Sequence, residues 1–173
     1  MIIEKIDGLY QVTAMKPFRK TKGVVFDLVP NEIVKETVSV DRVIHENDAI
    51  SPGEIGNVKR PWYFHPFQRD NLLVLNGYRT VELYTKDHGK IVTFEIHPDR
   101  IYKNGELLYE GGVMLSWPTQ VFHRITSGEK GSASLNFAMR KKGFDIKTNF
   151  NIYDLDLVTG EFYVLREGYK DQI

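Results

Sequence analysis

The sequence contains no cysteine, and this absence excludes several kinds of chemistry. Disulfide bonds, thiolate nucleophiles, cysteine-ligated zinc and iron–sulfur clusters all need a sulfur atom that these 173 residues lack. Histidine is also scarce, with five residues in the chain. Any catalysis or metal binding must therefore depend on imidazole and oxygen groups.

The chain has no excess of charge of either sign. Its 23 Lys and Arg residues balance 23 Asp and Glu residues, so the formal net charge is zero. Such a chain has no broad electrostatic attraction for nucleic acid or for an acidic membrane surface. We therefore expect a small-molecule substrate or ligand, and neither nucleic acid nor a membrane as partner.

Long apolar runs are absent too. No segment approaches the roughly 20 consecutive apolar residues that a transmembrane helix needs. Residues 1–6 mix charged and apolar side chains where a signal peptide would have an unbroken apolar stretch, so we expect a cytoplasmic protein. With 42% hydrophobic and 27% charged residues, the composition is that of a folded chain, and the length suits one domain.

Short strands dominate the apolar pattern. In residues 90–96 apolar side chains alternate with polar ones at a period of two, and residues 134–140 alternate in the same way. Residues 161–166 are rich in aromatic and β-branched side chains, which suit a pleated surface. Short strands separated by frequent turn signals predict a β-sandwich or a β-barrel. The turn signals are Asn76-Gly77, Asp87-His88-Gly89, Asn104-Gly105, Ser127-Gly128 and Thr159-Gly160.

Signals for helices are few. Residues 30–38 begin with Pro30 and Asn31, which could open a helix, but Val34, Val38 and Val40 fit a strand equally well. The chain shows no internal repeat and no linker between domains. We predict a single, mostly-β domain.

The side chains best suited to chemistry lie in residues 62–127. On a strand, Tyr63 and His65 would point to the same face. Pro66 bends the chain after this strand, and Asp70 can then return its carboxylate toward the imidazole of His65. This stretch therefore predicts a phenol, an imidazole and a carboxylate in one place.

A second stretch, residues 112–127, supplies another histidine. A strand ends at Pro118, a turn follows, and His123 begins the next strand. A turn that starts with proline just before a histidine is a common way to aim a side chain into a barrel. The spacing from Gly112 to Pro118 to His123 resembles the second motif of the cupin superfamily, Gly-x5-Pro-x-Gly-x2-His-x3-Asn.

The first stretch resembles the other cupin motif, Gly-x5-His-x-His-x3,4-Glu-x6-Gly, at its latter end. His65 stands in the place of the second histidine, Asp70 in the place of the glutamate, and Gly77 closes the motif. The chain departs from the family pattern where histidine, glutamate, glycine and asparagine are usual; the residues there are Tyr63, Asp70, Gln120 and Ser127.

The resemblance implies an all-β fold, the double-stranded β-helix or jelly-roll barrel of the germin and sugar-epimerase type. On this basis residues 1–59 form extra N-terminal strands or an arm, residues 60–140 carry the barrel motifs, and residues 141–173 supply closing strands. Cupins often pair through sheet edges and N-terminal strands, so the resemblance also implies a homodimer.

In cupins, three histidines and a glutamate converge on a divalent metal ion. Carried over residue by residue, this leaves His65, Asp70 and His123 as ligands for iron, manganese, nickel or zinc. The resemblance thus implies a metal-dependent oxygenase or isomerase acting on a small polar molecule, with Tyr63 and His65 as catalytic acid or base. Two alternatives stay open: a metal-free epimerase or isomerase of nucleotide-linked sugars, and a non-catalytic barrel that binds a carbohydrate or similar small ligand.

The remaining candidates are expected away from this site. His88 lies in a predicted hairpin tip, His97 at a strand end near the surface, and His45 in a polar loop. The arginines that could hold an anionic group are expected to be solvated; they are Arg60, Arg79 and Arg140.

Overall fold

The structure, a computed structural model, describes all residues from 1 to 173. Strands make up most of it, and the helices are short. Its elements in chain order are β1 (Ile2–Ile6), β2 (Tyr10–Ala14), β3 (Lys16–Thr21), β4 (Val24–Leu28), α1 (Asn31–Glu36), β5 (Ser39–His45), β6 (Ile50–Ser51), β7 (Trp62–Phe64), β8 (Gln68–Tyr84), β9 (Val92–Ile96), β10 (Arg100–Lys103), β11 (Glu106–Glu110), β12 (Val113–Trp117), β13 (Phe122–Arg140), α2 (Ile146–Asn149), β14 (Ile152–Leu155), β15 (Phe162–Arg166) and the 3-10 helix η1 (Gly168–Asp171).

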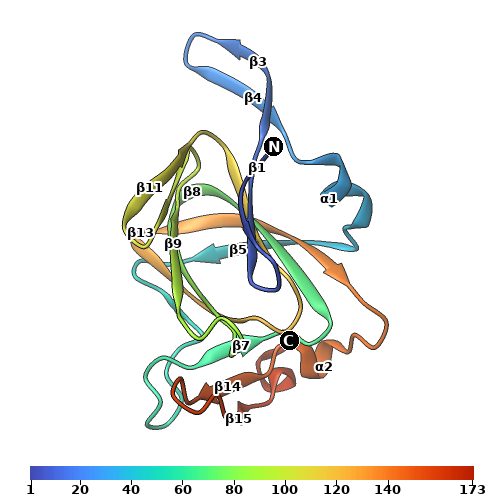
Figure 1. The fold of residues 1–173 in the computed structure, drawn as a ribbon, viewed down its shortest axis with the longest axis vertical. Coiled ribbons are helices and arrows are strands. Elements are labelled where there is room, and N and C mark those ends of the chain that lie inside the picture. The colour runs from blue at the N-terminus through green and yellow to red at the C-terminus, as the bar shows by residue number, and fades with distance from the viewer.

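A 13-stranded antiparallel sheet forms the body of the molecule. Its main path runs β1-β2-β12-β8-β13-β7-β14-β15, with β9 to β11 attached beside β8, and with β5 and β6 attached to β13. Figure 1 shows the strands curving around a central space, with α2, β14 and β15 across one end. The predicted all-β barrel is confirmed.

Residues 1–59 contribute to this sheet at two places. β1 and β2 join it beside β12, whereas β5 and β6 pair with β13. Between them, β3 and β4 form a separate two-stranded hairpin that projects from the body in Figure 1. The hairpin leaves several apolar side chains exposed, among them Phe18, Val25 and Leu28. The homodimer stays a prediction.

Residues 30–38, where helix and strand fit equally well, contain the helix α1, which ends at Glu36. The strand β5 begins only at Ser39 and includes Val40. Ile33 of α1 is buried with Met139 of β13, so the helix covers the outer face of that strand. No helix in the chain combines the length and the apolar composition needed to cross a membrane.

Two long strands, β8 and β13, run side by side through the sheet, and both bend at a glycine. Gly77 has a φ of +66° and Gly131 a φ of +71°, a conformation that glycine adopts without the steric penalty of a Cβ. The predicted turns at Asn76-Gly77 and Ser127-Gly128 are therefore wrong as strand ends. The chain bends there, the register shifts, and each strand continues in the same sheet.

The main core lies where β2, β8, β9 and β12 face one another. It contains 15 buried residues, including Val92, Phe94 and Ile96 of β9, whose alternation with polar neighbours confirms the predicted strand. A second, mostly aromatic cluster packs Trp62 of β7 against Phe122 of β13 and their neighbours. These two clusters fix the relative positions of the strands that carry the motif residues.

The alternation predicted in residues 134–140 is confirmed as well, but its polar face points inward. Asn136 and Arg140 of β13 line an internal cavity, whereas Met139 packs outward against α1. Asp70 of β8 lines the same cavity. The interior of the barrel is therefore partly polar, which makes it the place to look for a site.

We expect Gly77→Ala to destabilise the fold strongly, because the new Cβ would overlap the carbonyl oxygen of Gly131 in the neighbouring strand. Gly105→Ala is the matched control: Gly105 also has a positive φ, +86°, but nothing lies within 4 Å of its added Cβ. The control should lose about 1–2 kcal/mol of unfolding free energy. Gly77→Ala should lose about 1–3 kcal/mol more from the overlap. Urea denaturation measures both, and equal losses would contradict the close crossing of the two strands.

Candidate functional site

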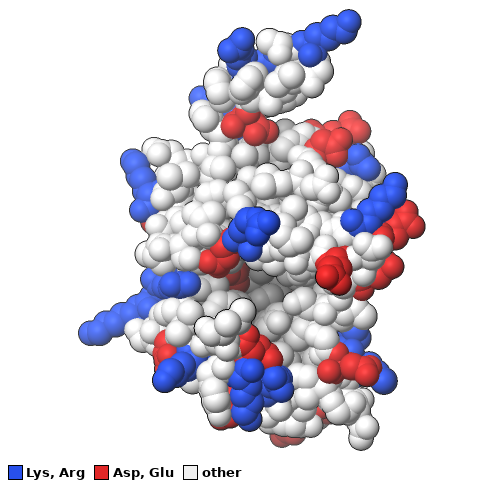
Figure 2. Space-filling model, turned by 180° about the vertical axis from the view of Figure 1, so that it is seen from behind, with Lys and Arg blue, Asp and Glu red and all other residues white.

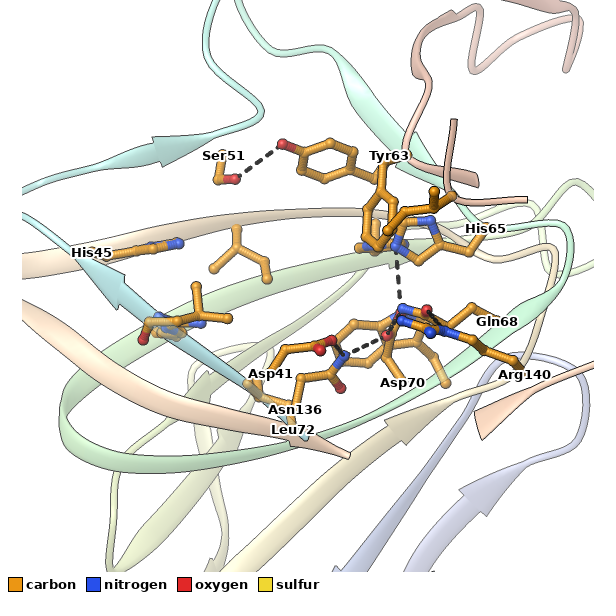
Figure 3. Close-up of a pocket in the computed structure, with 17 residues that line it drawn as sticks. Asp41, His45, Ser51, Tyr63, His65, Gln68, Asp70, Leu72, Asn136 and Arg140 are labelled. Carbon is orange, nitrogen blue, oxygen red and sulfur yellow. Dashed lines mark hydrogen bonds and ion pairs between the residues drawn. The ribbon is translucent and has the colours of Figure 1, made fainter. Parts of the chain in front are cut away.

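The polar interior of the barrel contains a cavity of about 340 Å³. This volume is within the range of small-molecule sites. β5, β7, β8 and β13 provide most of the walls. Figure 3 shows His65 at one end and His45 at the other, with Asp41, Asp70 and Asn136 along the wall between them.

The outer surface in Figure 2 carries no large patch of one charge. Lys and Arg are interspersed with Asp and Glu over this face, and the surface is hollowed near its middle. On this face, acidic and basic side chains are thus mixed, in line with their equal numbers in the sequence.

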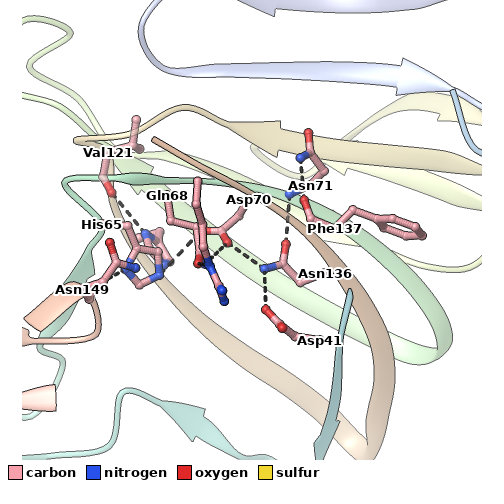
Figure 4. Close-up of polar contacts among 11 residues, drawn as sticks. Asp41, His65, Gln68, Asp70, Asn71, Val121, Asn136, Phe137 and Asn149 are labelled. Carbon is pink, nitrogen blue, oxygen red and sulfur yellow. Dashed lines mark hydrogen bonds and ion pairs between the residues drawn. The ribbon is translucent and has the colours of Figure 1, made fainter. Parts of the chain in front are cut away.

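His65 lies directly after β7 and is 5% exposed. Its Nδ1 lies 2.6 Å from the backbone carbonyl oxygen of Asn149 in α2. A carbonyl oxygen can only accept, so Nδ1 carries a proton and donates it. In the neutral form of the ring the lone pair is therefore on Nε2, which lies 3.6 Å from Oδ2 of Asp70 (Figure 4).

Asp70 is held in place by the amide groups of two neighbours. Its Oδ1 accepts hydrogen bonds from Nε2 of Gln68 at 2.8 Å and from Nδ2 of Asn136 at 2.7 Å (Figure 4). Its Oδ2 is buried and receives no hydrogen bond. A cation beside it, either a protonated His65 or a metal ion, would satisfy this oxygen.

His123 completes the cluster from β13. Its Nδ1 donates to the carbonyl oxygen of Val121 at 3.1 Å, which again leaves the lone pair on Nε2. Burial, and then the neighbouring His65, hold the pKa of His123 well below its usual value, so the ring stays neutral. The ligating atoms of His65, Asp70 and His123 all lie within 4.8 Å of one another. The structure thus confirms that the fold brings these three side chains together.

Tyr63 lies beside both imidazoles, on the face that its spacing from His65 predicts. Its ring centroid is 6.1 Å from that of His65 and 5.7 Å from that of His123, whereas Phe64 points away into the aromatic cluster. Burial raises the pKa of Tyr63, against the opposing effect of a hydrogen bond that its hydroxyl oxygen accepts from Ser51 at 3.4 Å. The phenol is therefore protonated at neutral pH and has a proton to donate.

Arg79 and His45 form the other end of the cavity, and both sequence predictions for them are wrong. Arg79 is not solvated but 2% exposed, donating from Nε to Oγ of Ser132 at 2.9 Å and from Nη2 to the Val43 carbonyl at 3.1 Å. His45 is not in a loop but is the last residue of β5, and it lines the cavity. Its Nδ1 lies 2.8 Å from Oγ of Ser127.

The bend of β8 explains why sequence reasoning missed Arg79. Before Gly77, Asp70 faces the cavity; after it, Arg79 does, although the two positions differ by an odd number of residues. A bulge in the pairing with β13 exchanges the two faces of the strand, and no pattern near Arg79 marks this exchange. Arg140 also lines the cavity rather than being solvated, and its Nε donates to Gln68 at 3.2 Å.

His88, His97 and Arg60 do not line this cavity. His88 lies in the turn between β8 and β9, and His97 follows β9, so the turn and strand-end positions predicted for them are confirmed. His97 pairs with Glu95 at 2.7 Å. Arg60 is partly buried rather than fully solvated, because it forms an ion pair with Glu82 at 2.9 Å.

Comparisons with known proteins bear on the fold. No protein-family profile matches the sequence, and no curated protein matches it. The sugar 3,4-ketoisomerase QdtA of Thermoanaerobacterium thermosaccharolyticum, solved in complex with TDP, has a TM-score of 0.52 and 16% identity, over 79% of this chain and 82% of the enzyme. A dTDP-sugar isomerase of Desulfovibrio desulfuricans G20 has a TM-score of 0.56 and 12% identity, over 83% of each chain. A double mutant of QdtA, also in complex with TDP, has a TM-score of 0.54 and 16% identity, over 82% of this chain and 85% of that one.

At 12% to 16% identity, this similarity establishes a shared fold. The cupin-type barrel predicted from the spacing of Gly112, Pro118 and His123 is therefore confirmed. Activity, by contrast, has to be inferred from the cavity and its side chains, because one fold hosts many reactions.

His45 should make the protein less stable in mild acid. Burial, and then the charge of Arg79, lower the pKa of His45 from 6.5 to about 4. Between these two pH values the unfolded chain binds a proton that the folded chain excludes, so stability falls as the pH falls from about 6.5 toward 4. Thermal unfolding of the wild type and of His45→Gln measures this. The wild-type melting temperature should decline more steeply over that range, and parallel curves would contradict a buried, neutral His45.

Proposed function

We propose that this cupin-fold chain is an isomerase of keto sugars, with His65 as its catalytic base. The observation that carries the proposal is the pairing of His65 with Asp70. The lone pair on Nε2 of His65 faces a carboxylate oxygen that has no hydrogen bond and lies 3.6 Å away. When Nε2 takes a proton from a substrate, the imidazolium gains this carboxylate as a partner, which favours the transfer.

The reaction needs only proton transfers. Nε2 of His65 removes the proton from a carbon that bears a hydroxyl group beside the carbonyl of the sugar. The electron pair of that C–H bond forms the C=C bond of an enediol, and the carbonyl oxygen takes up a proton. Loss of the proton from the other enediol hydroxyl, with return of a proton to the former carbonyl carbon, gives a ketone shifted by one carbon.

Tyr63 and His123 suit the proton transfers at oxygen. The protonated phenol of Tyr63, whose pKa is raised by burial, can donate to the carbonyl oxygen of the sugar. The neutral ring of His123 has its lone pair on Nε2 and can accept the proton of the neighbouring hydroxyl group. The centroids of the His65 and His123 rings are 4.6 Å apart, which suits groups that act at adjacent carbons.

Two further observations support a sugar as the substrate. The solved structures that share the fold include a sugar 3,4-ketoisomerase and a dTDP-sugar isomerase. The cavity of about 340 Å³ suits the sugar part of such a compound. Keto sugars with the carbonyl at C3 or C4, free or linked to TDP, are therefore the first compounds to test.

His65→Asn should reduce isomerisation about 10²- to 10⁴-fold, because it removes the base. The measurement is the incorporation of deuterium from D₂O into the sugar at the carbon beside the carbonyl, which NMR detects. His88→Asn is the matched control, since His88 lies in a turn that does not line the cavity, and it should exchange at the wild-type rate. Equal exchange in His65→Asn and wild type would rule out His65 as the base. A ligand-induced rise in melting temperature with no exchange would instead support the non-catalytic binding barrel.

A second candidate, a metal-dependent enzyme, is favoured by the same three side chains. His65 and His123 each donate Nδ1–H to a backbone carbonyl, an arrangement that commonly fixes Nε2 toward a metal ion. Oδ2 of Asp70 is buried and unpartnered. Two imidazoles and one carboxylate fit a divalent ion such as iron, manganese, nickel or zinc, which would polarise the carbonyl group of the substrate. Tyr63, being protonated, would add no ligand.

Chelation separates the two candidates. For the metal-free isomerase that we propose, deuterium exchange should persist after treatment with a chelator and dialysis. A metal-dependent enzyme should instead hold about one ion per chain after reconstitution with Fe(II), Mn(II), Ni(II) or Zn(II), and the His65→Ala/His123→Ala variant should hold none. Exchange that is lost on chelation and restored by one of these ions would favour the metal-dependent enzyme.

A further inference from the structure

Arg79 is a buried positive charge without a counter-ion. It is 2% exposed, and its hydrogen bonds go to the neutral oxygens of Ser132 and Val43. Burial lowers its pKa to about 10, which still leaves the guanidinium charged at neutral pH. Burying a charge without a partner is unfavourable. The environment of Arg79 is therefore incomplete without an anion.

The carboxylates that line the cavity do not supply this anion. Asp70 is directed at His65, with Oδ2 3.6 Å from Nε2. Asp41 accepts a hydrogen bond from Ser39 at 2.6 Å and another from Asn136 at 3.4 Å. Neither carboxylate forms an ion pair with Arg79, so the missing anion has to come from outside the chain.

A chain of hydrogen bonds leads from Arg79 to His45. A guanidinium N–H can only donate, so Nε of Arg79 donates to Oγ of Ser132 at 2.9 Å. Oγ of Ser132 lies 2.7 Å from Oγ of Ser127, which lies 2.8 Å from Nδ1 of His45. The arrangement in which every hydroxyl proton has an acceptor has Ser132 donate to Ser127 and Ser127 donate to Nδ1 of His45. In that arrangement the proton of the neutral His45 ring is on Nε2.

Two donors are therefore available at this end of the cavity. Nη1 of Arg79 and Nε2 of His45 form no hydrogen bond within the chain. Neither atom is fully buried. Both residues line the cavity, so both groups can be reached from it. A guanidinium with an imidazole N–H near it is a donor set for carboxylate or phosphate oxygens.

We propose that the end of the cavity formed by Arg79 and His45 binds an acidic group, carboxylate or phosphate, that the sugar itself carries. The substrate class is then a sugar acid or a sugar phosphate. That this sugar is also the compound isomerised at His65 rests on the function proposed above. The opposite ends of the cavity match such a molecule: donors face its acidic group, and the acceptors of His65, Asp70 and His123 face its C–H and hydroxyl groups.

The test is anion binding by the full chain, which is measured as a shift in thermal unfolding at constant ionic strength. Acetate and inorganic phosphate are the probes, and chloride is the reference. The wild-type melting temperature should rise saturably with acetate, phosphate or both. Arg79→Gln should weaken this binding about 10- to 100-fold. Arg124→Gln is the matched control, because the Arg124 side chain is only 15% exposed but is paired with Glu82 and does not line the cavity; its binding should equal that of the wild type.

If Arg79→Gln does not fold, the proposal can still be tested on the wild-type protein. The ring N–H of His45, identified by its absence in His45→Gln, should shift on anion addition in ¹H–¹⁵N NMR spectra. The proposal is overturned if neither anion binds saturably, or if Arg79→Gln binds as tightly as the wild type. It is also overturned if TDP binds in an Arg79-dependent way while acetate and phosphate do not, since the charge recognised would then belong to a nucleotide.

The same variants separate this inference from the proposed isomerase. His65→Asn should bind the anions as the wild type does, while it loses deuterium exchange. Anion binding with no exchange in any keto sugar acid or keto sugar phosphate overturns the isomerase alone. Exchange in neutral keto sugars at rates that Arg79→Gln does not alter, with no binding of anions, overturns the acidic substrate alone.

Discussion

The close crossing of β8 and β13 at Gly77 and Gly131 determines which side chains enter the cavity. Because Gly77 has no Cβ, its backbone can approach the carbonyl of Gly131 in β13, and because Gly131 has none, its backbone can approach the carbonyl of His45 in β5. The bend exchanges the faces of β8, so Asp70 before it and Arg79 after it line the same space. An unbent strand of 17 residues would present one face inward along its whole length, and one of these two residues would point outward.

As a result of this arrangement, the two ends of the cavity offer different hydrogen-bonding groups. At the end near α2, backbone carbonyls accept the Nδ1 protons of His65 and His123, so that lone pairs and a carboxylate oxygen are left for a ligand. At the other end, the guanidinium of Arg79 and the ring of His45 are linked through the hydroxyl groups of Ser132 and Ser127, and Arg79 supplies N–H groups. The substrate proposed above, which has different groups at its two ends, would match this cavity in one orientation only.

The sequence predicts the first end of the site and misses the second, for a physical reason. The spacing around two prolines is local, and it determines where His65, Asp70 and His123 point once the strands form. Arg79 and His45 meet only through the pairing of β8, β13 and β5, which lie far apart along the chain. A bulge in that pairing decides which face each residue takes. The strands were predictable because the alternation of apolar and polar residues is also local. The bends within them were mistaken for turns, because glycine is common in both.

Asn149 supplies the carbonyl that keeps the proton of His65 on Nδ1. It belongs to α2, in the C-terminal segment that lies across one end of the barrel, and the next residue, Phe150, lines the cavity (Figure 1). The C-terminal segment therefore does more than cover the barrel: through one backbone carbonyl it sets which nitrogen of His65 holds the ring proton and which faces the cavity.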